Sequence, residues 1–307
     1  MRTYLWAIFQ MHLRQMRLSE KLRAYASLMR LPYILALSFL CVLFTVTFQK
    51  GSCDPALIGL AVIAVAFTCA GGSAINDYCD RDSDALTHLE RPLSANQISP
   101  ARAAQFSALT FFVALGVSLT INFIAFGIVA INVLLFIIYS RVIKRLSGFV
   151  SNLLMGYLGA TIALFSGAVV FQTINAASLS FVGLIAGGAI GLNVLKDILT
   201  LEGDLKVGYP TLAATRGIRV ASIVGALFLL FSVITSPLPF FVGVVSVAYL
   251  FPISVWGGVA VVFSLALLKA SNTENVIERL RIFTIYWPYV VGVAGVVYIV
   301  PFIVWGA

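Results

Sequence analysis

Two clusters of polar residues with oxygen ligands lie directly after long apolar runs. Their members are Asn76, Asp77, Asp80 and Asp84 in the first cluster and Asp197, Glu202 and Asp204 in the second. The apolar runs before them, 55–74 and 177–195, are about as long as the roughly 20 residues of a membrane-spanning helix. Charge at the edge of a membrane is costly and by default marks a functional site. Because carboxylate clusters need neutralising and offer hard oxygen ligands, we expect them to bind a divalent metal, Mg²⁺ before zinc or copper.

The spacing within each cluster places selected residues on one helix face. Asn76, Asp80 and Asp84 recur at intervals of four residues, so a helix would align them. Asp77 and Asp82 would point elsewhere. Two acids of the second cluster are seven residues apart, which again corresponds to one face. The alternative is a solvated helix end with capping Asp and Asn residues. The predicted metal ligands are Asn76, Asp80, Asp84, Asp197 and Asp204.

The composition predicts an integral membrane protein. Of the 307 residues, 61% are hydrophobic and 10% are charged, and the mean hydropathy is +1.02. This leaves too little polar surface for a soluble protein of this length. We predict an all-α, polytopic fold of nine transmembrane helices around a central cavity. The predicted spans are 31–49, 55–75, 101–121, 122–140, 150–171, 177–199, 219–235, 238–267 and 282–304. The run 238–267 contains Pro252 and is expected to tilt or kink.

The distribution of basic residues tests this segmentation independently, because Lys and Arg gather in cytoplasmic loops. With nine spans and the N-terminus inside, 19 of the 20 Lys and Arg residues fall on the inner side, and only Lys50 falls outside. This predicts a protein of the cell (inner) membrane whose N-terminus and acidic loops face the cytoplasm and whose C-terminus faces out. Positive inner loops and anionic phospholipid account for the net charge of +8, so no nucleic-acid partner is expected.

Two regions are expected along the chain. Residues 1–30 interleave Arg and Lys with Leu, Met, Trp and Phe, which is typical of a basic amphipathic helix on the inner leaflet. Residues 31–307 contain no linker and are predicted to form one nine-helix domain. A faint repeat relates 55–102 to 177–219, each an apolar helix followed by an acidic cluster and a loop. Such a repeat would place the two clusters opposite each other across the cavity, with the loops that follow them as caps.

These motifs resemble the signatures of the UbiA superfamily of intramembrane prenyltransferases. The first signature, Asn-Asp-x-x-Asp-x-x-x-Asp followed by Arg-Pro-Leu, is met in full by residues 76–84 and 91–93. The second signature is met by Lys196-Asp197, Glu202-Gly203-Asp204, Gly208 and Thr211-Leu212. A third similarity is a run formed by Tyr139-Ser140, Lys144-Arg145 and Asn152. The order and spacing of these motifs extend the resemblance over nearly the whole chain.

The chain departs from the family pattern at three places. Leu192-Asn193 replaces the Arg-Glu that often precedes Lys-Asp in the archaeal lipid enzymes of the family. Thr200 stands where many members have the middle Asp of the second signature, so this site has one fewer carboxylate. Ser94-Ala95-Asn96 replaces the common Pro-Ser-Gly after the Arg-Pro-Leu motif. We expect Asn96 to adopt the left-handed backbone conformation that glycine would supply.

The resemblance implies Mg²⁺-dependent transfer of a polyprenyl group from an isoprenyl diphosphate to a lipophilic acceptor in the membrane. Two Mg²⁺ ions bridged by the diphosphate would stabilise it as the leaving group. The implied catalytic residues are Asp80, Asp197 and Tyr139, and Tyr139 would stabilise an allylic cation with its ring or orient the acceptor with its hydroxyl. Ordinary roles in positive inner loops and at the membrane interface are the alternatives for the basic residues and the tyrosine. The implied substrate-binding residues are Arg91, Lys144, Arg145, Asn152, Lys196 and Lys206.

Four functions are compatible with these residues. The form of the second signature is most similar to archaeal enzymes that add a geranylgeranyl group to geranylgeranylglyceryl phosphate in ether lipid synthesis, and this is the preferred prediction. The alternatives are an aromatic or chlorophyll-type acceptor, for quinone or pigment synthesis, and a UbiA-type terpene cyclase. A multispan transporter is the alternative from another class, but it would need acids near the bilayer midplane, whereas both clusters follow the cytoplasmic ends of their spans. The oligomeric state is not predicted.

A cysteine introduced at position 90 or 206 should react with a membrane-impermeant maleimide only from the cytoplasmic side, because both positions lie in loops assigned to the inside. Glu90→Cys and Lys206→Cys would be labelled in right-side-out and inverted vesicles, after replacement of the 4 native cysteines. The control Lys50→Cys should react from the outside. Labelling of position 90 or 206 from the outside alone would reverse the topology.

Overall fold

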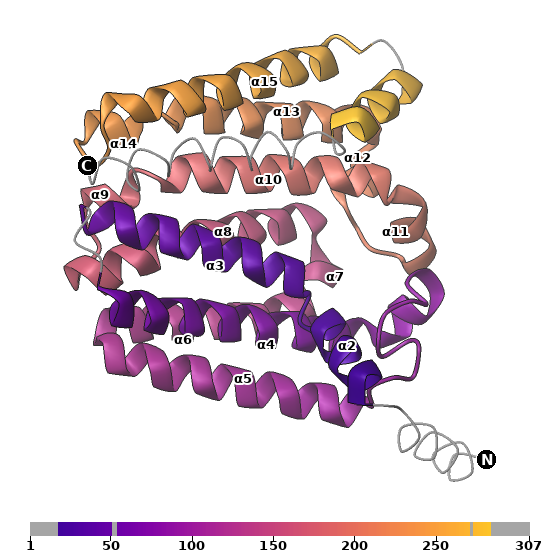
Figure 1. Cartoon of the computed structure of the whole chain (residues 1–307). Helices are drawn as coiled ribbons and strands as arrows, with labels where there is room; N and C mark the ends of the chain where they lie inside the picture. Colours follow the sequence, from indigo (N-terminus) through magenta and orange to yellow (C-terminus); the bar gives the residue numbers. More distant parts are fainter. Residues whose placement is uncertain (1–17, 51–53, 271–272, 284–307) are drawn as a thin grey trace.

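The computed structural model describes residues 18–50, 54–270 and 273–283, and within these ranges the chain forms helices and turns without a strand. The long helices run alongside one another in a bundle (Figure 1). Residues 273–283 are also helical. The predicted all-α fold is therefore confirmed. The labelled elements are α2 (Leu18–Leu28), α3 (Leu31–Phe48), α4 (Pro55–Thr87), α5 (Pro100–Ile121), α6 (Phe123–Ile138), η1 (Tyr139–Ile143), α7 (Lys144–Leu146), α8 (Gly148–Phe171), α9 (Ala176–Leu179), α10 (Val182–Leu199), α11 (Leu201–Val207), α12 (Leu212–Arg216), α13 (Ile218–Thr235), α14 (Leu238–Phe241), η2 (Val247–Tyr249) and α15 (Leu250–Leu268).

Within the described part of the chain, 8 segments are long and apolar enough to cross a membrane. They correspond to the first eight of the nine predicted spans, and nearly all of the ninth, 282–304, lies outside the described residues. The eighth span begins at residue 247 rather than at the predicted residue 238. The chain turns between α14 and α15, where Gly243 has a φ of 76°, so α14 extends the preceding span instead. Pro252 lies in the first turn of α15, where a helix needs no backbone N–H donor.

Helix α4 carries the first acidic cluster past the edge of the membrane. Its 33 residues make it roughly 50 Å long at 1.5 Å per residue, compared with a hydrocarbon core of ~30 Å. The helix begins at Asp54, whose carboxylate accepts hydrogen bonds from the N–H groups of Ala56 and Leu57 at 3.0 and 3.2 Å. The apolar first two-thirds can therefore span the membrane while the same helix continues without a break through the acidic residues.

Small residues allow the inner helices to approach closely. Helix α8 is central, because 61% of its most apolar window is buried, compared with 22% for the span 123–146. Helices α10 and α13 meet at Gly191 and Gly225, where a Cβ added to Gly191 would lie 2.8 Å from the Gly225 carbonyl oxygen. Such contacts between backbones are the usual way in which membrane helices pack.

Helix α2 is the described part of the predicted N-terminal amphipathic helix. Its buried residues Ala24 and Leu28 belong to a small hydrophobic cluster with Leu93 of the loop after α4, whereas Leu22 is 63% exposed. Arg30 has a left-handed backbone conformation, with a φ of 56°, and this turn joins α2 to α3. The helix is therefore docked on the bundle with apolar side chains also facing outward, and a location at the membrane interface remains our prediction.

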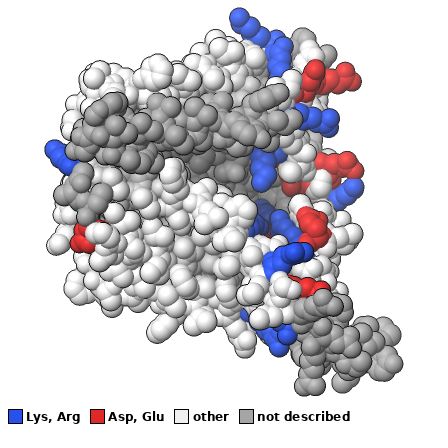
Figure 2. Space-filling view, viewed as in Figure 1, with Lys and Arg blue, Asp and Glu red and all other residues white. Residues whose placement is uncertain are grey.

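Charged side chains gather along one edge of the molecule (Figure 2). This is the end of the bundle at which α2, α11 and the loop after α4 lie (Figure 1). Most of the remaining surface in this view is uncharged. Eight apolar spans in the described residues and one charged rim define an integral membrane protein.

Gly191→Ala should lower the free energy of unfolding by about 1–3 kcal/mol, because the added methyl group would meet backbone atoms of α13 that cannot rotate away. The matched control is Gly116→Ala on α5, where nothing lies within 4 Å of an added Cβ. This control should be neutral or more stable by up to about 1 kcal/mol, since alanine favours the helix. Thermal unfolding in detergent would compare the two, and equal shifts would contradict the close contact.

Candidate active site

A cavity of about 480 Å³ enters the bundle between both acidic clusters. Along α8 its lining runs from Ser151 and Asn152 to Ile162 and Phe165, which is a distance of roughly 20 Å at 1.5 Å per residue. The cavity therefore has a polar mouth and a mainly apolar interior, whose lining also includes Thr68, Asn132 and Thr161. The apolar lining residues include Leu37, Val65, Val129, Leu158, Ile162 and Phe165.

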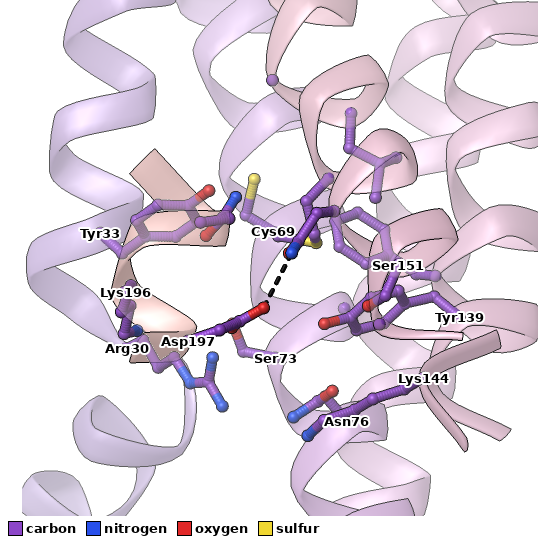
Figure 3. Close-up of a pocket in the computed structure, with 18 of the residues that line it drawn as sticks. Arg30, Tyr33, Cys69, Ser73, Asn76, Tyr139, Lys144, Ser151, Lys196 and Asp197 are labelled. Carbon is purple, nitrogen blue, oxygen red and sulfur yellow. Dashed lines mark hydrogen bonds between the residues drawn. The ribbon is translucent and has the colours of Figure 1, made fainter. Parts of the chain in front are cut away.

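Both acidic clusters contribute to this one cavity, as the repeat in the sequence predicts. Asn76 and Asp84 come from α4, Asp197 from α10 and Asp204 from α11. Figure 3 shows Asn76 and Asp197 on different sides of the pocket. Among the described residues, no three His, Cys, Asp or Glu side chains lie close enough together to hold a metal ion by themselves. Residues of the two clusters therefore lie on different sides of one cavity.

Asp80 lies behind the cavity wall and is only 1% exposed. Its Oδ2 accepts hydrogen bonds from Lys144 Nζ at 2.6 Å and from Asn76 Nδ2 at 3.0 Å. Its Oδ1 accepts a hydrogen bond from the Tyr209 hydroxyl at 2.9 Å. The Tyr209 hydroxyl also lies 3.0 Å from Ser83 Oγ. Asp80 is therefore held from three sides, and Tyr209 is a site residue that the sequence alone did not indicate.

Asp77 is connected to the cavity by two arginines and does not share the face of α4 that carries Asn76. It accepts hydrogen bonds from Arg30 at 2.9 Å and from Arg91 at 3.4 Å. Arg91 also bonds to Asp84, so one guanidinium links two carboxylates of α4. Arg30 and Arg91 both line the cavity. The loop that carries Arg91 turns at Asn96, whose φ of 56° confirms the expected left-handed conformation.

Asp197 and Asp204 of the second cluster are held by neutral partners. Asn152 Nδ2 donates to Asp197 Oδ2 at 2.8 Å, and Thr200 Oγ1 donates to Asp204 Oδ2 at 3.2 Å. Burial raises the pKa of Asp204, and the hydrogen bond from Thr200 lowers it again in part. Burial likewise raises the pKa of Tyr209, which keeps its hydroxyl a proton donor to Asp80. Thr200, the departure from the family signature, thus supplies a hydrogen bond where a carboxylate would add a negative charge.

The predicted substrate-binding residues separate into two groups. The members that line the cavity are Arg91, Lys144, Asn152 and Lys196. Arg145 instead donates to the carbonyl oxygen of Cys79 at 3.0 Å, and Lys206 pairs with Glu202 at 2.7 Å on the surface. Neither Arg145 nor Lys206 is among the lining residues. A direct contact between these two side chains and a ligand in the cavity is therefore not favoured by their positions.

Tyr139 begins η1, a short π-helical segment, and faces the cavity near Lys144 and Asn76 (Figure 3). Single π-helical turns inside α-helices are frequent at functional sites. The segment interrupts the regular helix between α6 and α7, so that Tyr139 and Lys144 both line the cavity although they are five residues apart. Figure 3 places Arg30, Tyr33 and Lys196 on the other side of the pocket.

The donor atoms of the two clusters suit Mg²⁺. They are carboxylate and amide oxygens, without thiolates, and those of Asn76, Asp84, Asp197 and Asp204 belong to residues that line one cavity. In proteins Mg²⁺ is commonly bound through one or two carboxylates together with substrate phosphates and water, rather than in a cage made of protein alone. The separation of the clusters is therefore compatible with ions whose remaining ligands come from a phosphate-bearing substrate.

The fold and the site define an all-helical membrane protein with an acidic cavity inside its bundle. Residues 36–287 match the model of the UbiA prenyltransferase family. Because this match covers well over half of the chain, the protein belongs to the UbiA prenyltransferase family, and it is an integral membrane prenyltransferase.

Three similar proteins illustrate the relationship. The chain is 34% identical over 200 residues to the digeranylgeranylglyceryl phosphate synthase of Natronomonas pharaonis, which covers 65% of this chain and 72% of that protein. A solved structure of digeranylgeranylglyceryl phosphate synthase in membranes has a TM-score of 0.76 and 26% identity, and the match covers 92% of this chain and 98% of that one. A UbiA homologue from Archaeoglobus fulgidus bound to GPP and Mg²⁺ shares the fold, with a TM-score of 0.63, 17% identity and coverage of 90% and 99%.

Asp77→Asn should lower the free energy of unfolding by about 1–3 kcal/mol, because Arg30 and Arg91 would lose a buried charged acceptor. The matched control is Asp82→Asn, since the Asp82 side chain is 88% exposed and pairs only with neighbouring Arg81 among the described ion pairs. That substitution should change stability by less than about 0.5 kcal/mol. Denaturant or thermal unfolding in detergent measures both, and equal effects would contradict a structural role for Asp77.

Proposed function

We propose that this prenyltransferase transfers a geranylgeranyl group from geranylgeranyl diphosphate to geranylgeranylglyceryl phosphate, with two Mg²⁺ ions bound between the acidic clusters. One observation carries the proposal: oxygen-ligand clusters face each other at the polar mouth of a cavity whose interior is apolar. The similarity to the synthases described above supports the choice of acceptor. The ligands of the Archaeoglobus fulgidus homologue support the choice of Mg²⁺.

The diphosphate of the donor would lie at the polar mouth. Asn76 and Asp84 on one wall and Asp197 and Asp204 on the other are the residues proposed to hold the ions, with Asp80 as the further carboxylate behind Asn76. Bound Mg²⁺ would neutralise the diphosphate and stabilise the charge that develops as it departs.

Cationic side chains around the mouth would bind the remaining phosphate oxygens. Arg91 offers a planar fork of N–H donors, while Lys144 and Lys196 offer ammonium groups, and all three line the cavity. Because each of these contacts strengthens as charge moves onto the leaving diphosphate, they would favour the transition state over the bound substrate.

The prenyl chain would extend along the apolar lining. That lining follows α8 over roughly 20 Å from the polar mouth, and it would keep water away from the reacting carbon. Tyr139 faces the same space and could place its ring beside an allylic cation. The C1–O bond of the donor would break with its electron pair going to the diphosphate. The acceptor hydroxyl oxygen would then bond to C1 and lose its proton to the departing diphosphate.

The charged rim that carries the cavity mouth is proposed to face the cytoplasm, where both substrates would present their phosphates. Basic residues from loops around the mouth are compatible with this orientation. The lipid tails of both substrates would then share the apolar depth of the membrane with the bundle.

Purified protein with geranylgeranyl diphosphate, geranylgeranylglyceryl phosphate and Mg²⁺ should form digeranylgeranylglyceryl phosphate, detected by mass spectrometry, and EDTA should abolish it. Asp197→Asn should reduce kcat by about 10²-fold or more through lost stabilisation of the leaving group. The exposed control Asp82→Asn should retain activity. Cyclic hydrocarbon formed without an acceptor would indicate a cyclase, and product only from aromatic or chlorophyll-type acceptors would indicate another acceptor class. Undiminished turnover in metal-free buffer would exclude the metal-dependent mechanism.

A further inference from the structure

Lys144 already neutralises the most deeply buried carboxylate of the first cluster. Its ammonium group donates to Asp80 Oδ2 at 2.6 Å. The Asp80 side chain is 1% exposed, whereas that of Lys144 is 25% exposed and lines the cavity. The lysine therefore stands between a buried anion and the space in which a diphosphate would bind.

Tyr209 fixes this arrangement from the loop between α11 and α12. The Lys144 ammonium lies 4.6 Å from the centre of the Tyr209 ring, while the tyrosine hydroxyl donates to the other oxygen of Asp80. The loop itself is anchored to α8, because the Gly148 N–H donates to the Pro210 carbonyl oxygen at 3.0 Å. A cation over an aromatic ring is held without being fixed to one hydrogen-bond geometry. The Tyr209 ring would therefore still contact the Lys144 ammonium after that ammonium leaves Asp80.

The contacts of Asp80 leave it little capacity for a further cation. Oδ1 accepts from Tyr209, and Oδ2 accepts from both Asn76 and Lys144. A divalent cation that approached Asp80 or the neighbouring Asn76 amide would meet the Lys144 ammonium at close range and be repelled. Binding of the cation alone would therefore require Lys144 to give up a buried anion without a new anionic partner, which is costly.

We infer that Lys144 competes with the divalent metal for Asp80 and transfers to the donor diphosphate when that substrate arrives, so that metal and diphosphate bind together rather than singly. The inference rests on the proposed metal-dependent function. The diphosphate supplies the new anionic partner that makes release of Asp80 favourable. Thermodynamic reciprocity then requires the same coupling in the other direction, so departure of the diphosphate weakens metal binding and returns Lys144 to Asp80.

The test measures Mn²⁺ affinity by electron paramagnetic resonance on the full chain in detergent, with and without inorganic pyrophosphate. In Lys144→Met, Mn²⁺ alone should bind about tenfold more tightly than in the wild type, which equals ~1.4 kcal/mol. The gain in affinity on adding pyrophosphate should shrink by a similar factor. The matched control Lys269→Met, at the exposed end of α15, should behave as the wild type. Unchanged Mn²⁺ affinity in folded Lys144→Met protein would overturn the inference.

A double-mutant cycle separates competition for Asp80 from a general loss of positive charge. In an Asp80→Asn background, adding Lys144→Met should leave Mn²⁺ affinity unchanged, because residue 80 no longer offers a carboxylate for which the lysine and the metal compete. The double variant buries no unpaired carboxylate at this position, so it keeps the test available if Lys144→Met alone does not fold. Tighter Mn²⁺ binding on going from Asp80→Asn to the double variant would refute competition. If the wild type binds no Mn²⁺ even with pyrophosphate, the metal-dependent function itself fails instead.

Discussion

Three buried carboxylates on one helix constrain the parts of the structure that surround them. Asp77, Asp80 and Asp84 of α4 are each at most 5% exposed. A buried carboxylate is tolerated only when it is paired, and each of these contacts a cation. The cations come from separate places: the α2–α3 junction, the loop after α4 and the start of α7. Pairing the three carboxylates of α4 with cations therefore requires these three segments to meet at the charged end of the bundle.

The carboxylates on the two sides of the cavity differ in the kind of partner that stabilises their negative charge. On α4 the carboxylates are paired with Arg30, Arg91 and Lys144. Across the cavity Asp197 and Asp204 form no ion pair within the described residues, and their hydrogen bonds come from an amide and a hydroxyl. One wall is thus close to electrically balanced, whereas the other keeps its negative charge. When a substrate arrives with its counter-ions, the carboxylates on α4 must exchange protein cations for new partners. Asp197 and Asp204 only gain partners.

The sequence predicts those features that depend on local periodicity. Apolar runs located eight spans, and the four-residue spacing placed Asn76 and Asp84 on the cavity wall. The break near Gly243 was missed because both sides of it are apolar and hydropathy does not register a turn in such a run. Arg30 as a partner of Asp77 and Tyr209 as a partner of Asp80 were also missed. Arg30 and Tyr209 are 47 and 129 residues away from them, so only the tertiary packing brings these groups together.

The substitution at Thr200 fits this division of the site. An Asp at this position, between Asp197 and Asp204, would add a third negative charge to a wall that lacks paired protein cations, and like charges at close range disfavour one another's ionised forms. Thr200 instead donates a hydrogen bond that favours the charged form of Asp204. The wall then carries two carboxylates that neutral groups can support. Because no protein cation has to be displaced from them, an added cation meets less resistance on this side than at Asp80.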